Sequence, residues 1–402
     1  LLRRKLAHEA AAIQAAEGAP TNAEKEPELS QIPREDPNNL PMSDRFILSL
    51  SRSAIDGINL ANLERDLLER FWALYSQRGV QFPRATIIEQ EPASETANFT
   101  IFLDEVPLLN IVMEPEHVLL SPTDLALYQD TYKNEHLEEL HCRVLSGYWV
   151  PVAHVEELVE LGVKLMGHEG IIGLVAFRIY EHNLGTLFSA AVLDILLETM
   201  RTTDPTTMSL VEEEMTRPAL LKTFRNLVED GVPLRPASLV LSSLYYWINN
   251  SESPTSLLLA ECMRASMKRQ LCYSIAKASG VLGLALIDPA IEVAIRRGLS
   301  EMRQHVADAA NEGIILEPEM IDTLLDKVRA LEKEHKAGSY QVTIVVAADL
   351  RRRMRNFLAT NDLHLPVLSP HEISPEISSF PIEIIDLAVE EENEDLILMD
   401  VD

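Results

Sequence analysis

The stretch Val342-Thr-Ile-Val-Val-Ala-Ala-Asp-Leu-Arg351 decides the fold of the C-terminal third of the chain. Val342–Ala347 is a short apolar run rich in β-branched residues, which predicts a buried strand. Asp349 is expected to cap a helix that runs to Ala359, and Leu365–Leu368 is the next predicted strand. A strand, a helix and a strand in this order predict a right-handed parallel crossover.

The predicted helix carries the basic run Arg351-Arg-Arg353-Met-Arg355. Leu350, Met354, Phe357 and Leu358 form its apolar face, so we expect the arginines on the solvated side. The chain has a formal net charge of −28, which opposes binding to nucleic acid. Pairing with acids of this or a neighbouring subunit is therefore favoured over a phosphate-binding role.

The first hundred residues predict an α+β arrangement in the order β-α-β-β. Phe46–Leu50 is the first expected strand, and Asn62–Gln77 is an amphipathic helix that stops at Gly79. Ala85–Glu89 and Phe99–Leu103 are the next two expected strands.

The middle of the chain is predominantly helical in its pattern. His154–Met166 is a predicted helix, and the apolar run Ile171–Phe177 is a predicted buried strand. Helices are then expected from Asn183 to Lys268. This region is interrupted by three breaks that contain proline, at Asp204-Pro205, Gly231-Val-Pro233 and Ser253-Pro254.

The two ends of the chain differ from its interior. Residues up to Pro41 are expected to form a polar linker, and the basic cluster Leu1-Leu-Arg-Arg-Lys5 suits the cytoplasmic flank of a membrane helix outside this chain. Asp386–Asp402 holds eight acids and no base, which favours a solvated tail. No run reaches the roughly 18 apolar residues that a membrane helix needs.

No stretch carries a recognisable catalytic, cofactor-binding or metal-binding pattern. Cys142, Cys262 and Cys272 lack CxxC spacing and are expected to be free buried thiols. His136-Leu-Glu-Glu-Leu-His141 lacks the HExxH spacing of a zinc site, so surface helix histidines are the favoured interpretation. Phosphate-binding glycine loops and GxSxG are missing as well. We therefore expect no enzyme activity, no cofactor and no metal.

Several segments, in the same order along the chain, resemble one family. Phe357-Leu358, Leu365-Pro-Val-Leu-Ser369 and Glu372-Ile373 follow the strand and Arg-rich helix as in the closing segment of the type III secretion export gate, the large inner-membrane subunit of flagella and injectisomes. Further resembling segments are Leu145-Ser-Gly-Tyr-Trp-Val150, Gly170–Leu184, Asn226-Leu-Val-Glu-Asp-Gly-Val-Pro-Leu-Arg235, and Arg264 with Arg269. The resemblance covers about Met42 to Ile377.

The resemblance implies a multidomain α/β (α+β) architecture. A second subdomain is inserted in the first, the third is helical, and the fourth is a strand-helix-strand α/β unit. The expected parts are a linker from an absent N-terminal membrane domain (1–41), subdomain 1 (42–114 and 175–195), subdomain 2 (115–174), subdomain 3 (196–268), subdomain 4 (269–380) and an acidic tail (381–402).

The resemblance also implies a role. The chain is expected to form a nonameric cytoplasmic ring at the bacterial inner membrane, as part of a multi-pass protein. The ring docks export chaperones with their cargo and orders substrate export. Expected partners are other export-apparatus proteins, gatekeeper proteins and the secretion ATPase complex, with no nucleic acid.

The docking cleft is expected between the first two subdomains, at Leu140, Arg143, Trp149 and His182. Flagellar members of the family dock chaperones through an Asp, a Phe and a Thr. Leu140, Arg143 and His182 stand at those positions here, so the cleft is expected to have a different chemical preference. The alternative is a soluble oligomeric scaffold or adaptor without catalytic activity. A gene product with a membrane anchor favours the export gate over the scaffold. A deep pocket with convergent ionisable groups would instead favour an enzyme.

Overall fold

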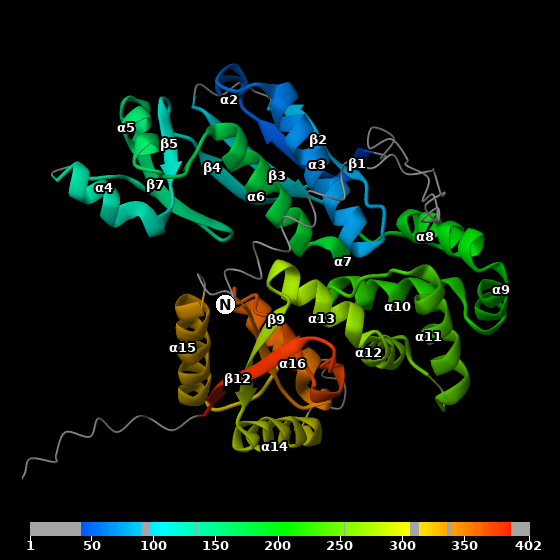
Figure 1. Cartoon of the computed structure of the whole chain (residues 1–402). Coiled ribbons are helices and arrows are strands. Elements are labelled where there is room, and N and C mark those ends of the chain that lie inside the picture. Colours follow the sequence, from blue (N-terminus) through cyan, green and yellow to red (C-terminus); the bar gives the residue numbers. More distant parts are fainter. Residues whose placement is uncertain are drawn as a thin grey trace, which may run out of the picture. The chain divides into compact units, whose positions relative to one another are not determined.

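The computed structural model describes residues 42–90, 96–133, 135–252, 254–305, 313–335 and 340–386. These residues belong to a single unit, Leu40–Asp402. The predicted linker (1–41) and nearly all of the acidic segment (387–402) lie outside the described residues. Within them, helices and strands alternate around three four-stranded sheets, which confirms the mixed α/β class (Figure 1).

The first sheet has the strand order β2-β1-β3-β4, with β1 and β2 parallel and the other pairs antiparallel. Its elements are β1 (Met42–Leu50), α2 (Arg52–Asp56), α3 (Leu60–Arg78), β2 (Arg84–Glu89), β3 (Asn98–Leu103) and β4 (Val106–Val112). Helix α3 begins at its N-cap Asn59 and ends at Gly79, whose φ of +73° suits glycine. The predicted β-α-β-β order and the helix stop are confirmed.

The second sheet is antiparallel, in the order β6-β7-β5-β8. Its elements are β5 (His117–Leu120), η2 (Pro122–Asp124), α4 (Leu125–Thr131), β6 (Glu139–Cys142), β7 (Leu145–Pro151), η3 (Val152–His154), α5 (Val155–Glu160) and β8 (Leu165–Met166). A small apolar cluster that includes Tyr128, Val150 and Leu158 holds these elements together.

Two predictions for this region are wrong. The helix expected over His154–Met166 ends at Glu160, because Gly162 turns the chain at φ +82° into strand β8. The histidine pair of His136–His141 is not on a helix, since His141 lies in strand β6.

The apolar run Ile171–Phe177 forms helix α6 (His168–His182) rather than the predicted strand. Ile171, Ile172, Val175 and Ala176 are all buried, so the helix is apolar on more than one side. A short apolar run of this kind does not distinguish a buried helix from a buried strand. Helix α6 packs on α3, where Tyr180 meets Phe71 edge to face with ring centroids 4.7 Å apart.

A helical block follows, and the three proline-containing breaks predicted from the sequence are confirmed. Its elements are α7 (Leu184–Leu187), α8 (Ala190–Thr203), α9 (Pro205–Glu214), α10 (Arg217–Glu229), α11 (Ala237–Asn250), α12 (Ser256–Ser266) and α13 (Lys268–Ala276). Asp204 caps α9 by accepting a hydrogen bond from the backbone of Thr207, with Pro205 as the first helical residue.

The third sheet is parallel throughout, in the order β11-β10-β9-β12. With its helices it forms the α/β unit: η4 (Lys277–Ser279), β9 (Val281–Ile287), α14 (Pro289–His305), α15 (Pro318–His335), β10 (Gln341–Val345), α16 (Ala348–Thr360), β11 (Val367–Leu368), η5 (Pro370–Glu372) and β12 (Ser378–Ile385). The parallel pairing of the two strands around α16 is confirmed. The N-cap of α16 is Ala347, not Asp349.

Both faces of the third sheet are buried. Leu282 and Leu284 of β9 pack into the core shared with the first sheet and the helical block. Ala285 and Ile287 of the same strand belong to a second core formed with α14, α15 and α16. Strands covered on both faces are typical of parallel sheets.

The segment expected to be an acidic tail from residue 381 begins as ordered strand. β12 continues to Ile385 beside β9, the Ile385 side chain is fully buried, and its carbonyl accepts a hydrogen bond from Asp288 N at 2.9 Å. Asp386 then pairs with Lys327, with Nζ and Oδ1 2.5 Å apart.

We therefore expect a chain that ends at Phe380 to be less stable than one that ends at Asp386. The shorter chain loses the last five of the eight residues of β12. One of them is the buried Ile385, whose loss alone corresponds to about 2–5 kcal/mol of the free energy of unfolding. Urea unfolding followed by circular dichroism measures the difference. Equal unfolding midpoints and slopes for the two chains would show that β12 contributes nothing.

Candidate functional site

A buried carboxylate at the end of α10 organises the candidate site. Helix α10 ends at Glu229, and Asp230 and Gly231 then turn the chain, with Gly231 at φ +71°. The Asp230 side chain is 0% exposed. A buried charge is unfavourable unless opposite charges and hydrogen bonds compensate it. Four guanidinium groups surround this carboxylate, those of Arg264, Arg351, Arg352 and Arg355.

Arg351 makes the shortest contact with Asp230, because its Nη2 donates a hydrogen bond to Oδ2 over 2.8 Å. The other three arginines place a nitrogen 3.7 Å from a carboxylate oxygen of Asp230. Burial raises the pKa of Asp230, but the charges of Arg264, Arg351 and Arg355 lower it by more. The net effect holds this pKa well below the ordinary value, so Asp230 is ionised at neutral pH.

Three further carboxylates balance the arginines. Glu372 accepts a hydrogen bond from Arg264 Nε at 2.6 Å, and its other oxygen accepts one from Ser369 N at 2.7 Å. Glu261 accepts a hydrogen bond from Arg351 Nε at 3.1 Å. Glu229 lies 3.3 Å from Arg352 Nη2. We call the four arginines with Asp230, Glu229, Glu261 and Glu372 the ionic cluster; its formal charges cancel.

The ionic cluster joins the helical block to the α/β unit. Its acids lie mainly on α10 and α12, while Arg351, Arg352 and Arg355 project from α16. The prediction that these arginines are solvated is wrong, since the Arg351 side chain is only 1% exposed. A carboxylate on a facing helix makes burial of a guanidinium tolerable, and that partner is not visible in the pattern of α16 alone. The expected pairing with acids of this chain is confirmed.

The segment Asn226–Arg235 also contacts α3. Arg235 Nη1 donates a hydrogen bond to the carbonyl of Ser76 at 2.8 Å, and the backbone N–H of Leu234 donates one to the carbonyl of Arg78 at 2.8 Å. In return, Arg78 Nη1 donates a hydrogen bond to the carbonyl of Gly231. One short segment therefore connects α3, the end of α10 and, through the ionic cluster, α16.

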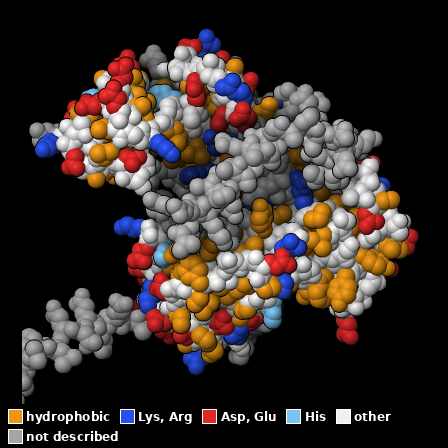
Figure 2. Space-filling model, viewed as in Figure 1, with side chains coloured by type: hydrophobic (Ala, Val, Ile, Leu, Met, Phe, Trp, Pro, Cys, Tyr) orange, Lys and Arg blue, Asp and Glu red, His pale blue; other side chains and the backbone are white. Residues whose placement is uncertain are grey.

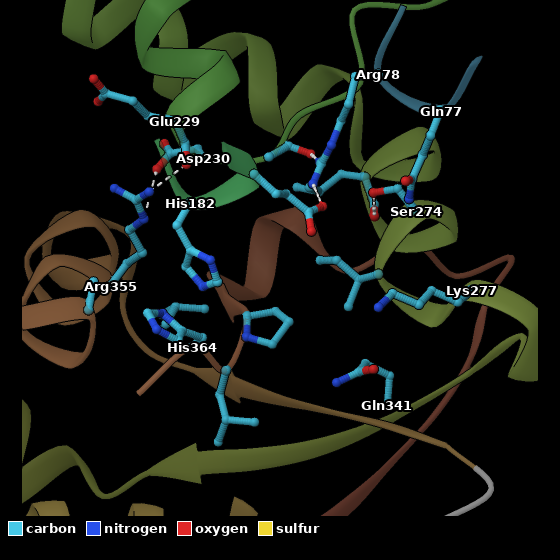
Figure 3. A pocket seen from close by; sticks show the side chains of 18 of the residues that line it. Gln77, Arg78, His182, Glu229, Asp230, Ser274, Lys277, Gln341, Arg355 and His364 are labelled. Atoms are coloured by element: carbon cyan, nitrogen blue, oxygen red, sulfur yellow. Dashed lines mark hydrogen bonds and ion pairs between the residues drawn. The ribbon is translucent and has the colours of Figure 1, made fainter. Parts of the chain in front are cut away.

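A cavity of about 710 Å³ lies against the ionic cluster, and we call it the central cavity. Its walls come from α3, α6, α13 and the segment after α16, with the end of α10 at the back. Figure 3 shows Arg78, His182, Lys277 and Gln341 arranged around the same space, with Asp230 and Arg355 to one side. The volume falls within the range of small-molecule sites in proteins.

Two of the four predicted docking residues reach this cavity. Arg143 and His182 both line it. Arg143 Nε lies 2.9 Å from Oδ1 of Asp362, and both side chains are more than half exposed. The other two predicted residues do not reach the cavity: Leu140 and Trp149 are 9% and 5% exposed and pack in the apolar core. Their part in docking stays a prediction, and so does that of Arg143 and His182.

His182 lies beside His364, with ring centroids 4.2 Å apart. Partial burial lowers the pKa of His364 to about 4, with a smaller contribution from the charge of Arg143. His364 is therefore neutral at pH 7.

All three cysteines are free, but only Cys272 is buried, while Cys142 and Cys262 are half-buried. Burial raises the pKa of the Cys272 thiol. Within the described ranges, no three His, Cys, Asp or Glu side chains are grouped so that they could hold a metal ion.

Sequence reasoning did not single out Asp230, Glu261, Glu372 or Lys277 as site residues. For Asp230 a signal existed, because an acid at a helix end followed by glycine lies inside the segment that resembled the export-gate family. For Glu261 and Lys277 no local pattern marks a function.

Comparison with known proteins gives a consistent result. The family model of the FHIPEP family matches residues 2–378. The chain belongs to the FHIPEP family. The resemblance to type III secretion export-gate proteins noted in the sequence is thereby confirmed.

Relatives and solved structures of this family agree. Low calcium response locus protein D of Yersinia pestis is 23% identical over 344 residues, 85% of this chain and 47% of that protein. The chain thus spans about half the length of that relative. The structure of the Chlamydia pneumoniae CdsV protein matches with a TM-score of 0.69 and 21% identity, over 85% of this chain and 98% of the other, and a similar match is a CdsV and CdsO complex.

A third solved structure is that of the nonameric EscV cytosolic domain from the type III secretion system. It matches with a TM-score of 0.63 and 15% identity, over 88% of this chain and 98% of the other. At these identities the likeness establishes the fold. The FHIPEP chain and its structural neighbours thus share the architecture of cytoplasmic domains of export-gate proteins.

The depressed pKa of Asp230 predicts how stability depends on pH. The unfolded carboxyl has a pKa of about 3.9, so its contribution is complete above that pH and is lost as the pH falls toward the lower folded pKa. We expect Asp230→Asn to be about 3–5 kcal/mol less stable than the native chain near pH 7. This difference should shrink by about 1.4 kcal/mol per pH unit below about pH 4.

Urea unfolding of both proteins between pH 2.5 and 7 provides the measurement. The other carboxylates titrate in both proteins, so the difference isolates Asp230. A difference that stays constant across this range would contradict the assignment of Asp230 as the ionised centre of the cluster.

Proposed function

We propose that this chain forms the cytoplasmic ring of a type III secretion export gate, in which it docks export chaperones with their cargo and orders substrate export. The observation that carries the proposal is the family match over residues 2–378 together with the shared fold of export-gate cytoplasmic domains. The chain acts as a receptor rather than as an enzyme.

Assembly into a homo-oligomeric ring is the first part of the proposal. The EscV cytosolic domain, which shares this fold, is described as nonameric. The described surface carries exposed large hydrophobic side chains on the helical block, at Tyr246, Leu257 and Leu258, and on β12, at Phe380 and Ile384. Figure 2 shows hydrophobic side chains gathered over this side of the molecule. Such surfaces are typical of protein–protein contacts.

Partners beyond the ring form the second part. The Chlamydia CdsV protein is solved in complex with CdsO, so a chain of this fold can hold a further protein of its system. We propose equivalent contacts here with other export-apparatus proteins, gatekeepers and the secretion ATPase complex. No described helix is both long and apolar enough to cross a bilayer. In the full-length protein we propose that this domain lies at the cytoplasmic face of the inner membrane, below a multi-pass membrane domain.

Arg143 is an exposed member of the proposed docking residues. Its side chain is 54% exposed, in the turn between β6 and β7, and its guanidinium group is always charged. An exposed cation selects acidic partner surfaces mainly through complementarity and association rate. The chaperone–cargo complexes of its own secretion system are therefore expected to present acidic groups to Arg143.

We expect Arg143→Glu to weaken binding of chaperone–cargo complexes while thermal stability stays within about 1 kcal/mol of the native chain. Arg329→Glu is the matched control, because Arg329 is 53% exposed and pairs with Asp326 at 3.0 Å, far from the proposed cleft in sequence. Surface plasmon resonance with immobilised rings measures both variants. Equal binding by Arg143→Glu and Arg329→Glu would show that Arg143 is not part of the docking site. A chain that assembles but binds no such complex would favour the scaffold alternative.

A further inference from the structure

The central cavity is lined by two cations, Arg78 and Lys277, that the proposed docking role does not use. The ionic cluster at its back is neutral as a group. Of the other charged residues that line the cavity, Arg70 pairs with Asp66 and Arg143 with Asp362. Arg78 and Lys277 are left with the single acid Glu181. The whole chain carries a net charge of −28, so a concave site of the opposite sign is unusual for this molecule.

Arg78 is incompletely compensated within the described structure. Its Nη2 lies 3.5 Å from Glu181, and its Nη1 donates to a backbone carbonyl. Its Nε is buried and has no hydrogen-bond partner among the described residues. Burial lowers the pKa of Arg78 by more than Glu181 raises it, which is the sign of a guanidinium short of negative charge. A buried donor without a partner is costly unless a ligand satisfies it.

Lys277 is a second cation at the cavity, and its backbone conformation is unusual. It begins the short helix η4 with φ +51° and ψ −140°, a backbone conformation that residues other than glycine rarely adopt. Its side chain is exposed at the cavity wall, and in the described part of the chain no hydrogen bond or ion pair is made by its ammonium group. Figure 3 shows Lys277 and Gln341 on the side of the cavity opposite His182 and His364.

The wall also carries apolar side chains among its polar ones. Leu74 and Phe177 from α3 and α6 face the cavity, as do Leu271 and Ile275 from α13. At about 710 Å³ the cavity is larger than an inorganic anion requires and suits a molecule with an uncharged part. Guanidinium and ammonium groups together with an apolar wall match a phosphate group attached to an organic body.

We propose that the central cavity binds a small organic phosphate, with the phosphate at Arg78 and Lys277 and the organic part against the apolar wall. Such a ligand supplies the negative charge that Arg78 lacks. Because it contacts α3 and α13, and lies against the ionic cluster, it stabilises the junction of these helices. Arg143 and His182 line the same cavity, but neither Arg78 nor Lys277 is among the proposed docking residues, so substitutions at Arg78 and Lys277 test ligand binding and Arg143→Glu tests docking.

Isothermal titration calorimetry of the complete chain tests the proposal. The probes are the four ribonucleoside 5′-monophosphates, each compared with its uncharged nucleoside and with inorganic phosphate. We expect at least one monophosphate to bind more tightly than both of its comparison ligands. Lys277→Gln and Arg78→Gln should each weaken that binding about tenfold or more, as expected for one lost charge-assisted hydrogen bond.

Lys164→Gln is the matched control, because Lys164 is exposed and does not line the cavity. It should bind the monophosphate as the native chain does. If Arg78→Gln does not fold, Lys277→Gln decides, since this exposed side chain has no role in the core. The proposal is overturned if no monophosphate binds more tightly than its nucleoside, if inorganic phosphate binds equally well, or if Lys277→Gln binds like the native chain. Loss of cargo binding by Arg143→Glu bears on the docking role alone.

Discussion

The burial of Asp230 among four arginines is the constraint on which the rest of the structure depends. A carboxylate with no exposed surface requires compensation, and its nearest compensating groups lie on α12 and α16, more than thirty and more than a hundred residues further along the chain. The helical block and the α/β unit must therefore meet with α10 and α16 in one fixed relation. Removing either side leaves uncompensated buried charge, which is far more costly than losing an exposed pair.

Four of the segments that carried the family resemblance meet at this cluster. Asn226–Arg235 supplies Asp230 and the contacts to α3, Arg264 comes from α12, the arginines of α16 follow the strand β10, and Glu372 belongs to the closing Glu372-Ile373 pair. Each segment alone is not specific to the family, and each contributes residues to the contact between the helical block and the α/β unit. The central cavity lies next to this junction, beside α3 and α13.

The sequence predicted those features whose cause is local. The β-α-β-β order, the helix stop at Gly79, the proline breaks and the parallel pairing around α16 all follow from short patterns. Two kinds of prediction failed. The apolar run in α6 fits a buried strand as well as a buried helix, so it was predicted as a strand. Arg351 was predicted to be solvated because the sequence of α16 does not reveal its buried partner Asp230. For the same reason Lys277 and the cavity were not foreseen, since their neighbours come from separate elements.

The central claim is that the ionic cluster couples the helical block and the α/β unit into one cooperative structure. Native-state hydrogen exchange at increasing low urea concentrations tests it, in the native chain, in Asp230→Ala and in the exposed-pair control Asp362→Ala. The account predicts that amides of α10 and α16 exchange through one common opening in the native chain and in Asp362→Ala. In Asp230→Ala the α16 amides should open separately and at lower free energy. A common opening for both helices in Asp230→Ala would contradict the claim.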